Sequence, residues 1–159
     1  YPEEHAERLG QNHAMIQSVR GFVAGNRPVY AECGGLIYLS QGIESAQGKR
    51  TSLAGLLPFW TRMRKNFKSL GYVEAVLREP SLLGPAGTAV RGHRFHYSEI
   101  IEGFDVDGWR PAYSIRRPNK EEKGDDGFLR GNVLACYTHA HLASRPGLIE
   151  NFAAHCQEG

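Results

Sequence analysis

One cysteine stands at a position where a thiol could act as a nucleophile. Cys33 follows a short apolar run at residues 29–31 and precedes Gly34 and Gly35. A side chain on a sharp strand-to-helix turn projects away from a sheet, and small neighbours let the backbone make the turn. The following helix N-terminus would favour a thiolate, and N–H groups at Gly34 and Gly35 could stabilise an oxyanion. The alternative is a small buried hydrophobic residue, and the spacing alone favours neither.

A cysteine nucleophile needs a base, which can be distant in sequence. His139 and His141 follow an apolar segment, residues 131–139, that is typical of a buried strand. In an open α/β sheet the carboxyl ends of parallel strands meet at one edge, where Cys33 would also emerge. We predict that His139 is the base and keep His141 as the alternative. Either histidine could instead be a solvated loop residue.

The other two cysteines are predicted to be structural. Cys136 lies within an apolar strand, and Cys156 lies on the apolar face of a C-terminal helix at residues 145–156. An odd number of scattered cysteines indicates neither a disulfide framework nor a zinc-finger spacing, so a reducing compartment fits best.

Alternating helix and strand patterns predict an α/β domain. A helix is expected from Pro2 to about residue 24, then a buried strand, the turn at Cys33 and a second helix. Further strands are expected at 69–77, 88–100, 111–117 and 131–139, and a charged loop at 116–127.

Composition points to one globular domain. The 159 residues are 41% hydrophobic, the formal net charge is +2, and no apolar run is long enough for a membrane-spanning helix. Basic residues are interspersed with acidic ones, so we expect neither nucleic acid nor membrane as a partner.

Four ordered motifs resemble one family. They are VYAECGGLIYL (29–39), GYVEA (71–75), RGHRFHYS (91–98) and YTHAHLAS (137–144). Together they closely resemble the C-terminal glutamine amidotransferase domain of the cobyrinate (or hydrogenobyrinate) a,c-diamide synthase family. The resemblance covers nearly the whole chain and favours Cys33 as a nucleophile.

The resemblance implies a flavodoxin-like, class I glutamine amidotransferase domain over residues 1–159, with a mostly parallel sheet flanked by helices. Cys33 would attack the side-chain amide of glutamine and form a thioester, with His139 as general base and acid. Ammonia would pass to an upstream synthetase domain of the same polypeptide, which would use ATP and Mg²⁺ to amidate a corrin precursor. The implied enzyme is a cytoplasmic ligase of cobalamin biosynthesis, without a cofactor or metal in this domain.

The chain departs from the common amidotransferase pattern at one position. Many such enzymes have a glutamate two residues after the catalytic histidine, where this chain has His141. The resemblance therefore implies a Cys–His pair without a carboxylate that orients the imidazole.

Four further side chains are candidate substrate-binding residues. Glu32 could steer the ammonium group of glutamine or cap local N–H groups. His93, His96 and Tyr97 could orient glutamine, shape the interface with the synthetase domain, or only make structural hydrogen bonds.

Two other functions remain open from the sequence. The spacings His93-x-x-His96 and His139-x-His141 could supply imidazoles to zinc or nickel in a metal-binding module. The chain could also be a catalytically silent interaction domain that keeps the amidotransferase fold.

Overall fold

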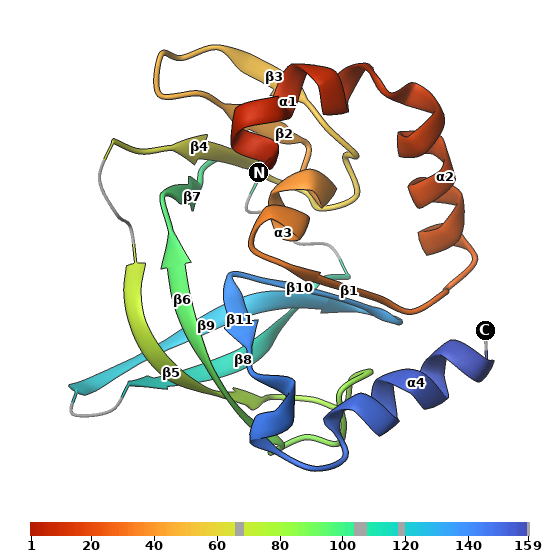
Figure 1. Ribbon diagram of the computed structural model, residues 1–159, viewed down its shortest axis with the longest axis vertical. Helices are drawn as coiled ribbons and strands as arrows, with labels where there is room; N and C mark the ends of the chain where they lie inside the picture. The colour runs from red at the N-terminus through yellow and green to blue at the C-terminus, as the bar shows by residue number, and fades with distance from the viewer. Residues whose placement is uncertain (66–68, 104–107, 118–119, 159) are drawn as a thin grey trace.

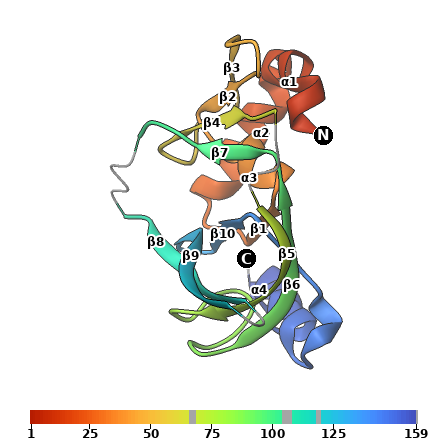
Figure 2. The same ribbon diagram turned by 90° about the vertical axis from the view of Figure 1, so that its left-hand side faces the viewer.

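The chain folds around two β-sheets with helices beside them (Figure 1). The computed structural model describes residues 1–65, 69–103, 108–117 and 120–158. One sheet has seven strands in the order β1-β10-β9-β8-β5-β6-β11, and the other has four in the order β3-β2-β4-β7. Figure 2 shows the small sheet at one end of the molecule and the curved strands of the large sheet at the other.

The helices are α1 (Pro2–Gln11), α2 (His13–Ala24), α3 (Gly34–Leu39) and α4 (Leu148–Glu158), with a short 3₁₀ turn at Leu142–Ser144. The strands are β1 (Val29–Glu32), β2 (Gly42–Glu44), β3 (Arg50–Ser52), β4 (Trp60–Met63), β5 (Ser69–Leu77), β6 (Ala89–His96), β7 (Ser98–Ile100), β8 (Arg110–Arg117), β9 (Lys120–Arg130), β10 (Val133–Cys136) and β11 (Thr138–Ala140).

The N-terminal helix predicted from Pro2 to about residue 24 is two helices. Asn12 ends α1 and begins α2, and its side-chain oxygen accepts a hydrogen bond from the Met15 N–H at 3.1 Å. Asparagine is a good helix cap because its side chain replaces a missing backbone acceptor. The expectation of one continuous helix was wrong because Asn12 caps α2 within a stretch whose apolar spacing continues across the break.

The large sheet is mixed rather than mostly parallel, which corrects that part of the prediction. Strands β1 and β10 pair in parallel, as expected for the strands before Cys33 and His139. The β10–β9, β9–β8, β8–β5, β5–β6 and β6–β11 pairs are antiparallel. Antiparallel strands can be joined by short turns, so the middle of the chain forms hairpins rather than βαβ units.

The charged loop predicted at 116–127 is also corrected, because most of it belongs to β8 and β9; residues 118–119 lie outside the described residues. Strand β9 pairs with β8 on one side and with β10 on the other. Asp125 is exposed and Asp126 is buried, as the alternation along a strand requires. The charges thus lie in a paired strand, where backbone pairing outweighs a turn-like composition.

The hydrophobic core comprises two clusters, and the thiols differ in their relation to them. Cys136 is fully buried, as predicted. Cys156 is exposed, which contradicts the prediction. Helix α4 packs on the sheet through Leu148 and Phe152, whereas Ile149 is 55% exposed. The apolar face of α4 is therefore covered only in part.

None of the helices in the described ranges is long and apolar enough to cross a membrane.

Candidate active site

Cys33 lies on the strand-to-helix turn that the sequence predicts. It follows β1 directly and is the N-cap of α3, with φ 46° and ψ −97°. A positive φ at a residue with a side chain costs about 1–3 kcal/mol and is found mostly at functional sites. The Cys33 N–H donates to the Cys136 carbonyl at 2.8 Å, which ties the turn to the end of β10. The neighbouring strand therefore holds the strained conformation.

The two glycines after Cys33 are required by close packing. A Cβ atom at Gly34 would lie 2.9 Å from Cδ of Pro2, at the start of α1. A Cβ atom at Gly35 would lie 3.1 Å from the Ala31 Cβ. Both contacts are tight, so glycine lets α1 and α3 approach the turn.

A cavity of about 410 Å³ opens beside the Cys33 side chain. The Sγ atom lies 4.0 Å from the Phe95 carbonyl oxygen on β6. The lining combines titratable and aromatic side chains from four parts of the chain, namely α1, the Cys33 turn, the β6–β7 segment and β11. The lining residues are Tyr1, Pro2, Glu3, Glu32, Cys33, Gly34, Ile37, Met63, His93, Phe95, His96, Tyr97, Ser98 and His139. Gly35 is absent from this lining and contributes to a neighbouring cavity under α1 and α2.

Of the two candidate bases, only His139 lines the cavity that holds Cys33. Its ring stacks on that of His93, with the centroids 4.7 Å apart and the planes inclined by 12°. His141 is exposed and lines an adjacent cavity, which His93 and His139 also line but Cys33 does not. Its N–H donates to the Arg91 carbonyl at 2.9 Å. The shared cavity supports the prediction that His139 is the base.

One oxygen of the Glu32 carboxylate accepts hydrogen bonds from groups of the protein. Its Oε1 atom accepts hydrogen bonds from the Tyr30 hydroxyl and from the Ala140 N–H, both at 2.7 Å. The contact with the Ala140 N–H is of the capping kind, and the Glu32 side chain also lines the cavity.

The other candidates differ in their environment. His96 is 5% exposed, and its Nδ1 atom lies 2.8 Å from the Ser98 carbonyl oxygen. Its ring stacks on that of Tyr137, with the ring centroids 3.9 Å apart. Tyr97 is 38% exposed and makes an edge-to-face contact with Phe95. His93 and Tyr97 therefore present side chains to the cavity, whereas His96 mainly packs beneath them.

The four histidines of the metal-binding alternative do not form one ligand cluster, although His93 and His139 stack on each other. Successive side chains of β6 alternate between the two faces of the sheet, so His93 is exposed and His96 is buried. Among the described residues, no group of three or more histidine, cysteine or carboxylate side chains could hold a metal ion. The geometry does not favour the metal-binding module.

The electrostatic environment of Cys33 restrains its ionisation. Burial raises the pKa of the thiol above its ordinary value, and the Glu3 carboxylate raises it further. A hydrogen bond from the Gly34 N–H acts in the opposite direction and lowers that pKa. Because the thiol is mainly protonated at neutral pH, it needs a base before it can attack.

Removing the Glu3 charge is expected to lower the pKa of Cys33. In Glu3→Gln a negative charge near the developing thiolate is lost, so the thiolate forms at a lower pH. The pH dependence of Cys33 alkylation by iodoacetamide, followed by mass spectrometry, should shift toward acid.

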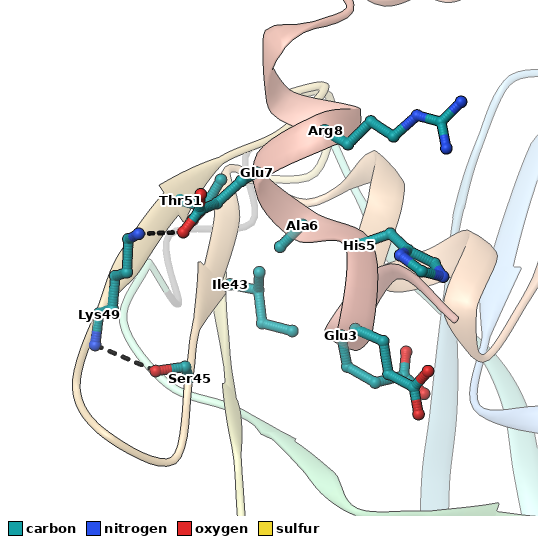
Figure 3. Close-up of a pocket in the computed structure, with 10 residues that line it drawn as sticks. Glu3, His5, Ala6, Glu7, Arg8, Ile43, Ser45, Lys49 and Thr51 are labelled. Atoms are coloured by element: carbon teal, nitrogen blue, oxygen red, sulfur yellow. Dashed lines mark hydrogen bonds and ion pairs between the residues drawn. The ribbon is translucent and has the colours of Figure 1, made fainter.

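Glu7→Gln is the matched control. Glu7 is on the same helix as Glu3, but it does not line the Cys33 cavity and is paired with Lys49 between β2 and β3 (Figure 3). Its alkylation profile at Cys33 should match that of the unmodified chain, and an equal acid shift in both variants would contradict the assignment to Glu3.

A comparison with known families identifies the family of the chain. Residues 1–147 match the CobB/CobQ-like glutamine amidotransferase domain. The chain belongs to this family. The family resemblance inferred from the four motifs is thus confirmed.

Among curated relatives of this amidotransferase domain, the cobyrinate a,c-diamide synthase of Syntrophotalea carbinolica is 48% identical over 159 residues. That alignment covers 99% of this chain and 34% of the relative. The proteins of the same name from Salmonella typhimurium and Methanobrevibacter smithii are 34% and 30% identical, over 97% and 99% of this chain and 33% and 34% of theirs. The chain thus spans about a third of the length of these relatives.

A solved structure supports the fold. The crystal structure of a glutamine amidotransferase aligns with a TM-score of 0.62 and 18% identity, covering 95% of this chain and 72% of that chain. The α/β amidotransferase fold class is therefore confirmed, with the mixed strand directions described above.

Proposed function

We propose that this domain hydrolyses glutamine through a Cys33 thioester and supplies ammonia for the a,c-diamidation of cobyrinate or hydrogenobyrinate. The observation that carries the proposal is that Cys33, on a strained strand-to-helix turn, shares one cavity with His139. Family membership and the name of the relatives, cobyrinate a,c-diamide synthase, support the substrate class.

The first half of the reaction forms the thioester. His139 takes the proton from the Cys33 thiol, and the thiolate attacks the side-chain amide carbon of glutamine. The Gly34 N–H, at the start of α3, stabilises the oxyanion that forms on the amide oxygen. When the tetrahedral intermediate collapses, His139 returns the proton to the leaving nitrogen, and ammonia departs.

The second half releases glutamate. A water molecule gives a proton to His139 and attacks the thioester carbon, after which the C–S bond breaks and the thiol is restored. His93 and Tyr97 form walls of the cavity and would orient the substrate. The Glu3 carboxylate lines the same cavity and would attract the ammonium group of glutamine. The bound ammonium charge would then offset the increase that Glu3 causes in the pKa of the Cys33 thiol.

The remaining parts of the reaction belong to the rest of the polypeptide. A synthetase domain upstream would bind ATP and Mg²⁺, activate the acetate carboxyl groups of a corrin precursor and consume the ammonia. Residues 1–159 would form the glutaminase domain, with no cofactor of its own, in a cytoplasmic enzyme that needs neither nucleic acid nor membrane.

A glutamine analogue with a diazoketone in place of its amide is expected to label Cys33 and neither Cys136 nor Cys156. Cys136 is fully buried, whereas Cys156 is exposed but lies outside the cavity, so only Cys33 combines access with the binding site. Peptide mass spectrometry identifies the labelled thiol.

Iodoacetamide, which does not resemble glutamine, should label the exposed Cys156 and serves as the control. Equal labelling of Cys33 and Cys156 by the glutamine analogue would count against a glutamine site at Cys33.

A further inference from the structure

Sheet pairing by itself gives little support to the strand that carries His139. Strand β11 has three residues, lies at the edge of the large sheet and, among the described strands, pairs with β6 only. Short edge strands have one unpaired side and few ladder hydrogen bonds. A base at such a position needs additional support, because a displacement of about 1 Å can cost roughly 100-fold in rate.

Two carboxylates accept hydrogen bonds from the backbone on either side of His139. Before it, Asp126 on β9 accepts from the Thr138 N–H at 2.8 Å, the Thr138 hydroxyl at 2.6 Å and the Tyr137 N–H at 3.3 Å. After it, Glu32 at the end of β1 accepts from the Ala140 N–H. N–H groups two residues apart on a strand point to the same edge. The two carboxylates therefore act where a neighbouring strand would otherwise pair with β11.

Both carboxylates are themselves well placed for this role. Asp126 is 6% exposed, with the Arg94 guanidinium 3.8 Å away, and a buried charge is retained only where it is paired and hydrogen-bonded. Glu32 directly precedes Cys33 in sequence, so its bond to Ala140 links the nucleophile turn to the strand of the base.

We propose that Glu32 and Asp126 are positioning residues for His139, holding the backbone of β11 in place of a carboxylate on the imidazole ring. The proposal rests on the function proposed above. Many amidotransferases have a glutamate two residues after the catalytic histidine that orients the imidazole, and this chain has His141 there. Here the contacts of Glu32 and Asp126 with the β11 backbone would orient His139 instead.

The test compares Glu32→Gln with Glu32→Met in glutamine hydrolysis by the full-length enzyme. Both donors bond to Oε1, so the glutamine amide oxygen can still accept them, whereas methionine keeps a similar volume without an oxygen acceptor. We expect kcat of Glu32→Gln to stay within about threefold of the original. Glu32→Met should lose about 10- to 100-fold in kcat with KM nearly unchanged.

A double variant separates positioning from a general structural effect. If Glu32 acts through His139, adding Glu32→Met to His139→Ala should lower kcat by less than about threefold, because residues that act as a unit are non-additive. Hydrogen exchange at the Ala140 amide gives a second measurement, with protection kept in Glu32→Gln and lost in Glu32→Met.

Asp126→Asn tests the other carboxylate. It places an amide NH₂ among the N–H and O–H groups that donate to Asp126, so it should also lower kcat more than it raises KM.

Three results would overturn the proposal. Similar increases in KM for Glu32→Gln and Glu32→Met would make Glu32 a ligand of the substrate ammonium group. Full activity of Glu32→Met would show that the Ala140 contact is dispensable. A full additive loss in the double variant would show that Glu32 acts independently of His139. If His139→Ala alone leaves kcat unchanged, the base assignment fails, and this outcome is distinct from all three.

Discussion

Cys33→Ser is expected to reduce glutamine-dependent amidation by the full-length enzyme by at least about 1,000-fold, because loss of a catalytic nucleophile removes the covalent route. Amidation supported by added ammonium chloride should remain within about twofold. Serine replaces one atom of the side chain, so the turn and its hydrogen bond to the Cys136 carbonyl should persist. Product formation is measured with each nitrogen donor in turn.

Cys156→Ser is the matched control for Cys33→Ser. Cys156 is exposed near the C-terminal end of α4 and lies outside the Cys33 cavity, so both activities should be unchanged. Equal loss of the glutamine- and ammonia-dependent activities in Cys33→Ser would indicate a structural role for Cys33 and contradict the proposed function.

His139→Ala should slow thioester formation by about 100- to 10,000-fold at neutral pH, the range usual for loss of a general base. The Cys33 thiol depends on this base because burial and Glu3 raise its pKa. At a pH above that raised pKa the thiolate forms without His139, so part of the rate should return. Single-turnover measurement of glutamate release or of covalent glutamyl enzyme, as a function of pH, checks both expectations.

His141→Ala provides the comparison within the same segment. His141 is exposed and does not line the Cys33 cavity, so its removal should change the rate by less than about threefold. A large effect at His141 with none at His139 would move the base role to His141.

The local patterns around the site were read well from the sequence. The apolar run before Cys33, the glycines after it and the position of His139 beyond a buried strand follow from short-range stereochemistry. The fold class also followed, because the order of helix, strand and turn is a local property. The strand directions did not, since β5, β6, β8 and β9 are antiparallel through pairings that composition does not reveal.

The contributions of Glu3 and Asp126 were missed for the same reason. Glu3 lies in the predicted N-terminal helix, and Asp126 lies in the segment predicted as a charged loop. No sequence signal marks either contact, because Glu3 approaches Cys33 through the packing of α1 on the turn, and Asp126 reaches Thr138 on β11 from β9. The sequence also placed Cys156 in the core, since helical periodicity does not show how far a partner surface extends.

The amino-acid sequence by itself determined the candidate nucleophile, the turn that presents it and the family to which the chain belongs, because these depend on neighbouring residues and on ordered motifs. Only the tertiary structure shows that His139 rather than His141 shares the cavity of Cys33, and that Glu32 accepts hydrogen bonds from Tyr30 and Ala140. Both features depend on strands that are distant in sequence and neighbouring in space. That proximity is created when β1, β6 and β11 assemble around one cavity, and no short stretch of the chain contains it.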